Sequence, residues 1–166
     1  MFTAKSFGKW AIAGIAAATL VACGGGEKAE EQAKAQVKAD VINWKMVTTW
    51  PKNFPGLGTG AEKLAKNITE MSGGRLNVKV YAAGELVPPL EVFDAVSRGT
   101  AEMGHGASYY WKGKAPAAQF FAAVPFGLTA QEINAWVSHG GGMELWEEVY
   151  APFNLVPMAA GNTGVQ

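Results

Sequence analysis

The stretch VINWKMVTTWPKNFPGLGTGAEKLAKNITEMSGGRLNVKVY, residues 41–81, determines the expected fold. Residues 41–49 have the apolar and β-branched content of a buried strand, and residues 76–81 alternate as a strand with one covered face does. Gly73-Gly74 supplies a left-handed cap for the helix between them. We expect the inner face of that helix to carry apolar residues at helical spacing, namely Leu57, Ala61, Leu64, Ala65, Ile68 and Met71.

The same alternation continues along the chain. A helix over residues 90–98 is expected to point Leu90, Phe93 and Val96 inward, and a strand of small residues follows at 101–106. A capping box at residues 129–132 starts a helix through Val137, which Gly140–Gly142 interrupt before it resumes at 143–150. Residues 154–159 form a candidate last strand, with Pro157 marking its end or an irregular edge. Strands that alternate with helices predict an α/β fold with a mainly parallel sheet and helices on both faces.

Ligands bind such sheets beyond the carboxyl ends of the strands. In this sequence those ends are rich in aromatic and small polar side chains, which suit a binding cleft. They are residues 48–51, 81–84, 105–111 and 161–166.

The single cysteine, Cys23, indicates where the protein works. Residues 1–22 combine Lys5 and Lys9 with an apolar run that is too short to span a membrane, as a secretory signal does. Leu20-Val21-Ala22-Cys23 resembles the lipobox of bacterial lipoproteins, which predicts a lipid on Cys23, a flexible tether over residues 23–40 and a membrane-anchored protein in the periplasm or on the outer face of the envelope. The alternative is an ordinary cleaved signal with an incidental cysteine.

Composition and motifs exclude several classes. The chain has 14 Lys+Arg and 14 Asp+Glu, and removing Lys5 and Lys9 leaves 12 against 14, or about −2, with no basic stripe for nucleic acid. Neither a His-Glu-x-x-His pair nor a Gly-x-Ser-x-Gly elbow is present, so no catalytic residue is predicted. Residues 56–60 lack the ending of a phosphate loop, and His105 is better read as a hydrogen-bonded residue at a strand end than as a catalyst. Residues 41–166 suffice for one small domain or part of a larger one.

Several segments in a fixed order carry a family resemblance. From Trp44 to Gln166 the chain resembles the N-terminal part of DctP-type solute-binding proteins of tripartite ATP-independent periplasmic (TRAP) transporters, in the branch that binds 2-oxoacids. The segments are SGGRL (72–76), GELVP (84–88), FDAV (93–96), GTAEMG (99–104), SYYWKGK (108–114), FFAAVPFG (120–127) and GNTGVQ (161–166).

The resemblance implies a periplasmic-binding-protein-like lobe, one of two that close on an organic acid and hand it to a membrane permease. Trp50, Tyr109 and Tyr110 would line the cleft as substrate-binding residues, and Asn162 would orient the turn or the ligand. Gln166 would bind the substrate and help hold a metal ion, expected to be sodium, that bridges to a pyruvate-like 2-oxoacid. The family forms homodimers through C-terminal helices, so a dimer is expected only of a full-length protein.

The positive charge that should pair with a substrate carboxylate is not evident. Arg75 and Arg98 are the two arginines, and neither follows a strand, so both are expected to be solvated. The family's carboxylate-binding arginine would fall beyond Gln166. We therefore expect 41–166 to be an incomplete N-terminal lobe, without the second lobe, of a protein about twice as long. The leading function is a non-enzymatic solute receptor; the alternative is an exported enzyme or a carboxylate sensor on the same scaffold.

Overall fold

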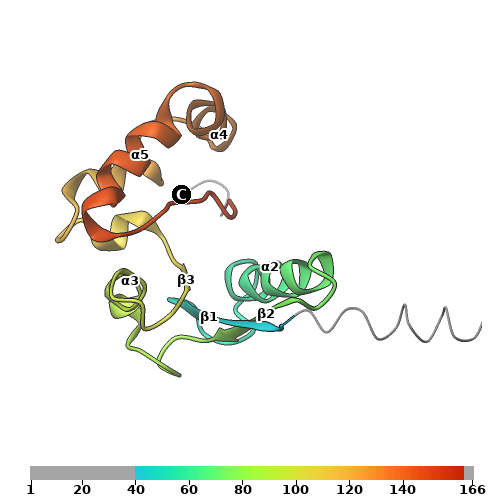
Figure 1. The fold of residues 1–166 in the computed structure, drawn as a ribbon. Coiled ribbons are helices and arrows are strands. Elements are labelled where there is room, and N and C mark those ends of the chain that lie inside the picture. The colour runs from blue at the N-terminus through green and yellow to red at the C-terminus, as the bar shows by residue number, and fades with distance from the viewer. Residues whose placement is uncertain (1–39, 163–166) are drawn as a thin grey trace, which may run out of the picture. The chain divides into compact units, whose positions relative to one another are not determined.

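The computed structural model describes residues 40–162, so the expected signal, Cys23 and nearly all of the tether lie outside the described residues. Strands and helices alternate as the sequence predicts (Figure 1). The elements are β1 (Ile42–Thr48), α2 (Leu57–Met71), β2 (Leu76–Tyr81), α3 (Val92–Ser97), β3 (Met103–His105), α4 (Ala130–His139) and α5 (Gly142–Tyr150), with short 3-10 helices η1 (Pro89–Glu91), η2 (Ser108–Trp111), η3 (Pro116–Phe121) and η4 (Ala151–Phe153).

The three strands form one parallel sheet in the order β2-β1-β3. Val47 of β1 pairs with Tyr81 of β2, and Thr48 pairs with His105 of β3, so the three strands end at the same edge. From β1 the chain passes through α2 to β2, which lies on one side of β1. From β2 it passes through α3 to β3, which lies on the other side of β1. This reversal is a topological switch point, where open α/β sheets bind ligands.

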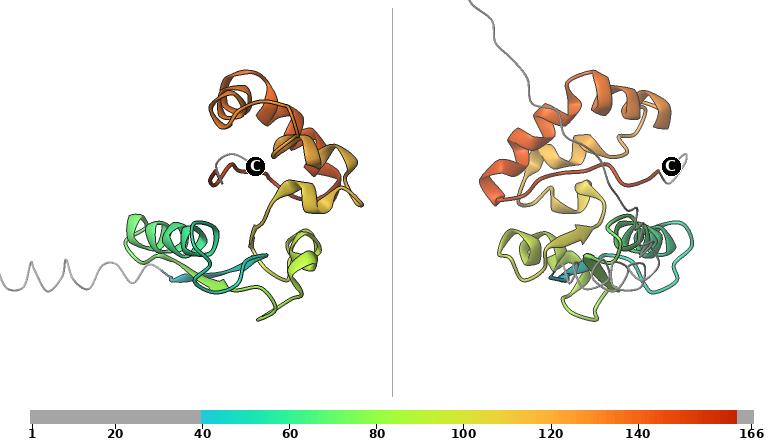
Figure 2. Two further views of the ribbon diagram at one scale, coloured as in Figure 1. Left: turned by 180° about the vertical axis from the view of Figure 1, so that it is seen from behind. Right: turned by 45° about the vertical axis from the view of Figure 1, so that its right-hand side comes forward.

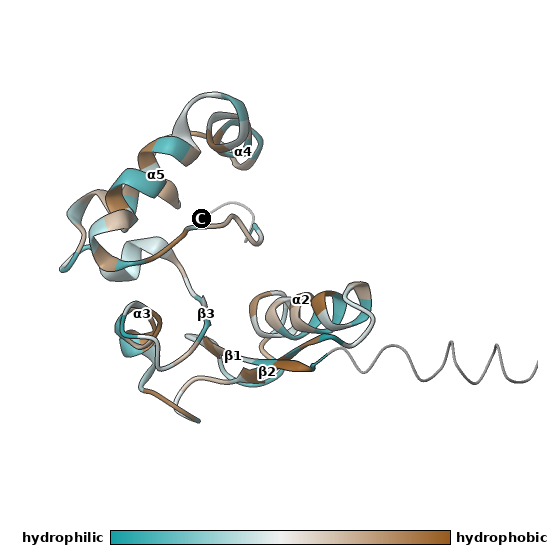
Figure 3. Ribbon diagram, viewed as in Figure 1, coloured by the Kyte–Doolittle hydropathy of each residue, from teal (hydrophilic) through white to brown (hydrophobic). Residues whose placement is uncertain are grey.

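Helices cover both faces of the central strand, which confirms the expected layering. Met46 and Val47 are each 1% exposed and, as neighbours on a strand, point to opposite faces. Helices α2 and α5 each carry both hydrophilic and hydrophobic residues (Figure 3). Met46 packs with Ala61, Ala65 and Val78 on the α2 side; Val47 packs on the other side with Val92, Phe93, Ala95, Ala101, Trp111, Ala115, Ala118, Phe121, Trp146 and Tyr150.

The boundaries of α2 and α4 follow their capping residues. Gly73 and Gly74 have φ of 62° and 78°, the left-handed cap expected after α2. Thr129 accepts a hydrogen bond from the Glu132 amide, and the Glu132 carboxylate accepts one from the Thr129 amide at 2.8 Å. Both predicted signals are therefore confirmed.

Two residues expected on inner helix faces are exposed instead. Met71 is 88% exposed although it lies about 20° around the helix from Leu64, which packs against the core; it is the last residue of α2. Leu90 is 64% exposed because it belongs to the 3-10 turn η1, whose tighter rotation precedes the α-helix. Val92, Phe93 and Ala95 are the buried residues of α3.

The expected last strand at 154–159 is wrong. The segment after η4 has no regular secondary structure and is drawn as a coil in both views of Figure 2. Pro157 has no amide proton to donate to a ladder. Val156 and Met158 would share one face of a strand and are each 75% exposed, so that face is not covered as both faces of a buried parallel strand would be.

Candidate functional site at the strand exits

Trp50 connects the exits of all three strands. It follows β1 and is 8% exposed. Its carbonyl oxygen accepts a hydrogen bond from the Ala83 amide after β2 at 2.8 Å, and its indole Nε1 donates to Nδ1 of His105 in β3 at 2.7 Å. The Thr49 amide also donates to the His105 carbonyl oxygen at 3.0 Å. Three of the four strand ends predicted to meet are thus brought together.

An aromatic wall extends from Trp50 into η2. The rings of Trp50 and Tyr110 lie 6.0 Å apart between centroids, and those of Tyr110 and Tyr109 lie 4.7 Å apart in an edge-on arrangement. Tyr110 is 38% exposed, so its ring faces solvent in part. Burial, and next a hydrogen bond with Tyr109, raises the pKa of Tyr110, which keeps this phenol protonated at neutral pH. The three predicted aromatic residues therefore pack in one continuous row, in which Trp50 is buried and Tyr110 is partly exposed.

His105 is a hydrogen-bond acceptor at the end of β3, as its position in the sequence suggested. Burial lowers the pKa of its imidazole, since a desolvated ring resists the positive charge. Its edge meets the Trp50 ring at a centroid distance of 6.2 Å. Sequence reasoning did not identify Trp50 as its partner, although a parallel register that pairs residue 48 with residue 105 brings the two together.

Glycines at the end of β3 allow close packing. A Cβ on Gly106 would stand 2.9 Å from Thr49 Cγ2 and 3.1 Å from Trp111 Cζ2, both side chains beside the strand exits. Gly104 has its close contacts with α3 instead. At both glycines the nearest neighbours are therefore side chains.

Two hydroxyl groups near these exits are buried. Thr49 Oγ1 and Ser108 Oγ have no hydrogen-bond partner within residues 40–162. Ser108 is 5% exposed and borders a cavity of about 130 Å³ between β3, α3, α5 and the segment after η4. Ser108 is a polar residue of this region that the sequence analysis did not single out; its position at the start of η2, beside two tyrosines, is the signal that could have found it.

Two predicted site residues remain. Asn162 is exposed near the end of the described chain, and Gln166 lies outside it. No group of three or more His, Cys, Asp or Glu side chains able to hold a metal ion occurs in residues 40–162. The roles of Asn162 and Gln166 therefore stay predictions.

Both arginines are on the surface, as expected. The Nε of Arg75 donates to the Ser72 carbonyl oxygen at 3.3 Å, and Arg98 pairs with Glu91 at 3.8 Å. A closer ion pair joins Lys114 to Asp94 of α3. None of these charges belongs to a strand exit, so the described exits offer a ligand aromatic faces and polar groups but no arginine.

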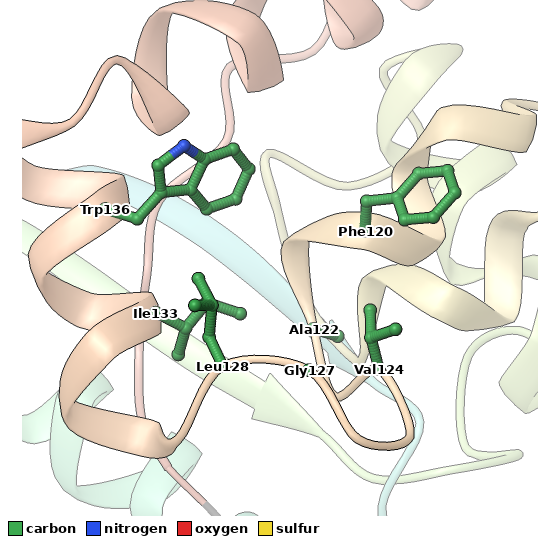
Figure 4. Close-up of a pocket in the computed structure, with 7 residues that line it drawn as sticks. All are labelled: Phe120, Ala122, Val124, Gly127, Leu128, Ile133 and Trp136. Carbon is green, nitrogen blue, oxygen red and sulfur yellow. The ribbon is translucent and has the colours of Figure 1, made fainter.

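A second hollow is apolar and is formed by other elements. It has a volume of about 240 Å³ and is lined by residues of α4 and of the segment before it, including Phe120, Leu128 and Trp136 (Figure 4). Phe120 and Trp136 stand on opposite sides of it in Figure 4. It lacks the hydrogen-bonding groups that orient a carboxylate, so the strand exits are the better candidate site. Within the described chain, no helix is both long and apolar enough to cross a bilayer.

A parallel α/β lobe with an aromatic site at its switch point is typical of a ligand-binding domain. Residues 46–165 match the family model of bacterial extracellular solute-binding protein family 7, DctP. The chain belongs to this family, whose members are the solute-binding proteins of TRAP transporters.

Relatives of known ligand type share this part of the chain. A monocarboxylate 2-oxoacid-binding periplasmic protein of Nostoc sp. is 50% identical over 125 residues, which are 75% of this chain and 34% of that protein. This chain therefore spans about a third of the length of that relative.

Solved structures confirm the fold. A TRAP periplasmic solute-binding protein of Pseudoalteromonas atlantica with bound sodium and pyruvate is 45% identical, with a TM-score of 0.74, over 76% of this chain and 39% of that one. One of Colwellia psychrerythraea with bound calcium and pyruvate is 43% identical, with a TM-score of 0.73, over 75% of this chain and 38% of that one. The described lobe is thus part of a periplasmic-binding-protein-like architecture.

Proposed function

We propose that this chain supplies part of the extracytoplasmic receptor of a TRAP transporter, which binds a pyruvate-like 2-oxoacid together with a sodium ion and delivers the acid to the membrane permease. The observation that carries the proposal is the joining of three strand exits at Trp50, on the switch point of the sheet. The pyruvate and metal ions bound by two relatives support the choice of ligand.

In this proposal the aromatic wall forms one side of the acid's binding site. Trp50 contributes the small exposed part of its ring, because its indole proton is already donated to His105, and Tyr109 and Tyr110 add phenol groups. Asn162 orients the ligand, and Gln166 supplies an amide oxygen to the cation, which suits a hard metal ion.

The envelope location is part of the same proposal. Residues 1–22 direct export, a lipid on Cys23 anchors the chain, and residues 23–40 form the tether. The name of the Nostoc relative, a periplasmic protein, supports this location. Intact-mass measurement of protein isolated from membranes tests it: a lipid mass that Cys23→Ser abolishes is expected, and an unmodified cysteine would refute the anchor.

Thermal denaturation tests the receptor function. The protein expressed from the complete reading frame is heated with pyruvate, with and without sodium; a rise in the melting temperature that needs sodium is expected, because a ligand that binds only the folded state stabilises it. Recovery of chemically unchanged pyruvate separates a receptor from an enzyme. Turnover of pyruvate, or no shift with any 2-oxoacid, would contradict the proposal.

Matched ligands and variants sharpen this test. Propionate lacks the 2-oxo group and acetone lacks the carboxylate, so each is expected to give a smaller shift than pyruvate. Tyr110→Ala removes part of the aromatic wall and is expected to weaken pyruvate binding. Phe126→Ala, which removes a fully exposed aromatic side chain outside the wall, is the control and is expected to bind as the parent does.

A further inference from the structure

The position of Trp50 depends on the protonation state of His105. An indole N–H is only a donor, so the 2.7 Å contact between Trp50 Nε1 and His105 Nδ1 requires a lone pair on Nδ1. A neutral imidazole with a lone pair on Nδ1 carries its proton on Nε2. The contact therefore defines one tautomer of His105.

We propose that His105 is a positioning residue of the strand-exit site: its neutral Nε2-protonated ring holds the Trp50 indole through Nδ1, and Trp50 in turn fixes the exposed ring of Tyr110. The effect on ligand binding rests on the proposed function, whereas the hydrogen bond itself does not. Protonation of Nδ1 would set two donors against each other, releasing Trp50 and loosening the wall. The low pKa that burial gives His105 agrees with a neutral working form.

The charged and titratable groups that surround the pair come from three elements. On η2 the neighbouring titratable groups are the phenols of Tyr109 and Tyr110, and Lys112 follows them. On the β2 exit, the Glu85 carboxylate accepts a hydrogen bond from the Ala82 amide at 2.9 Å. On the β1 exit, Lys52 is exposed. No ion pair within the described chain includes His105.

Nitrogen NMR tests the tautomer without any ligand. In the full chain we expect His105 to show an unprotonated Nδ1 and a protonated Nε2 at pH 8, with a pKa below the ordinary value of a histidine. Trp50→Phe keeps an aromatic ring but removes the donor, so the pKa of His105 should rise. A proton on Nδ1, or a pKa that Trp50→Phe leaves unchanged, would overturn the proposal.

Substitutions then test positioning in the protein from the complete reading frame, with pyruvate and sodium. Asn places an acceptor near the position of Nδ1 but does not titrate, so His105→Asn should bind as the parent does at pH 8 and keep its affinity at pH 5, where the parent weakens. His105→Leu removes the acceptor and should weaken binding by about tenfold at both pH values, the equivalent of one lost hydrogen bond.

The outcomes that would contradict the role of His105 differ from those that would contradict the receptor function. If His105→Asn weakens with acid as the parent does, or binds as poorly as His105→Leu at pH 8, His105 does not act through Nδ1. If the parent does not bind pyruvate, the receptor proposal fails, while the NMR experiment still decides whether His105 holds Trp50. Melting temperatures of all variants, measured without ligand, separate a positioning effect from loss of the fold.

Discussion

Gly104 of β3 lies so close to Val92 of α3 that a Cβ on the glycine would stand 2.9 Å from Val92 Cγ1 and 3.0 Å from Val96 Cγ2. Val92 is 2% exposed and cannot move aside freely. We expect Gly104→Ala to lower the free energy of unfolding by about 1–3 kcal/mol through overpacking. Gly113→Ala is the control, because a Cβ there meets no atom within 4 Å. Urea titrations of both variants measure the difference; equal stability would contradict the close contact.

Phe121 should be a large contributor to stability. Its ring is stacked between Trp136, at a centroid distance of 5.6 Å, and Trp146, at 5.2 Å. Phe121→Ala opens a cavity in this stack and is expected to lower the free energy of unfolding by about 3–5 kcal/mol. The exposed Phe126 is the matched control, for which Ala should change stability by no more than about 0.5 kcal/mol. Chemical denaturation followed by tryptophan fluorescence distinguishes the two.

The ion pair between Lys114 and Asp94 should tie the loop after η2 to α3. The Asp94 side chain is 23% exposed, so removing its partner leaves a largely buried carboxylate uncompensated. Lys114→Met is expected to lower the free energy of unfolding by about 1–2 kcal/mol, and adding Asp94→Asn should restore part of the loss. Lys112→Met, at an exposed lysine two residues earlier, serves as the control. Additive effects in this double-mutant cycle would mean that the pair contributes nothing.

Stability should fall on acidification through His105. Its folded-state pKa lies below the ordinary value of 6.5, so the unfolded chain takes up a proton first as the pH falls. The contribution of His105 is therefore present above about pH 6.5 and is lost as the pH falls through the lower folded-state pKa. His105→Asn should remove this part of the pH dependence, which melting curves of parent and variant from pH 8 to 5 would reveal. Parallel pH profiles would contradict it.

The chain of 166 residues should bind pyruvate only weakly by itself. A carboxylate in a partly dry site needs a cation or several oriented donors, and both arginines of this sequence serve surface contacts. Calorimetry with pyruvate and sodium is expected to give little heat for this chain and clear binding for the product of the complete reading frame. Submicromolar binding by the 166-residue chain would show that the strand exits suffice.

Patterns that depend on neighbouring residues were read correctly from the sequence. Strand β1, helix α2 and strand β2 lie within one or two residues of their expected ranges, because periodicity and the Gly73-Gly74 cap are local signals. The aromatic residues at the exits were also predicted, since parallel strands end at one edge.

Features that depend on residues distant in the sequence were not predicted. Whether 154–159 becomes a strand depends on a paired neighbour, which its apolar content cannot reveal. The partnership of Trp50 with His105 depends on the register of β1 with β3. Met71 is the last residue of α2, and helical spacing alone does not show how far along the helix the core extends.

The order of strands in the sheet also determines when each strand can pair during synthesis. The backbone amide of Lys45 in β1 bonds to Glu102, 57 residues later, so the second neighbour of the central strand is made long after the strand itself. At about 5–20 residues per second, synthesis of that interval takes about 3–11 s. During those seconds β1 can already pair with β2, and α2 can pack against them. The face of β1 that carries Val47 still faces water. A nascent chain of this order therefore exposes an apolar surface that a holdase chaperone would recognise.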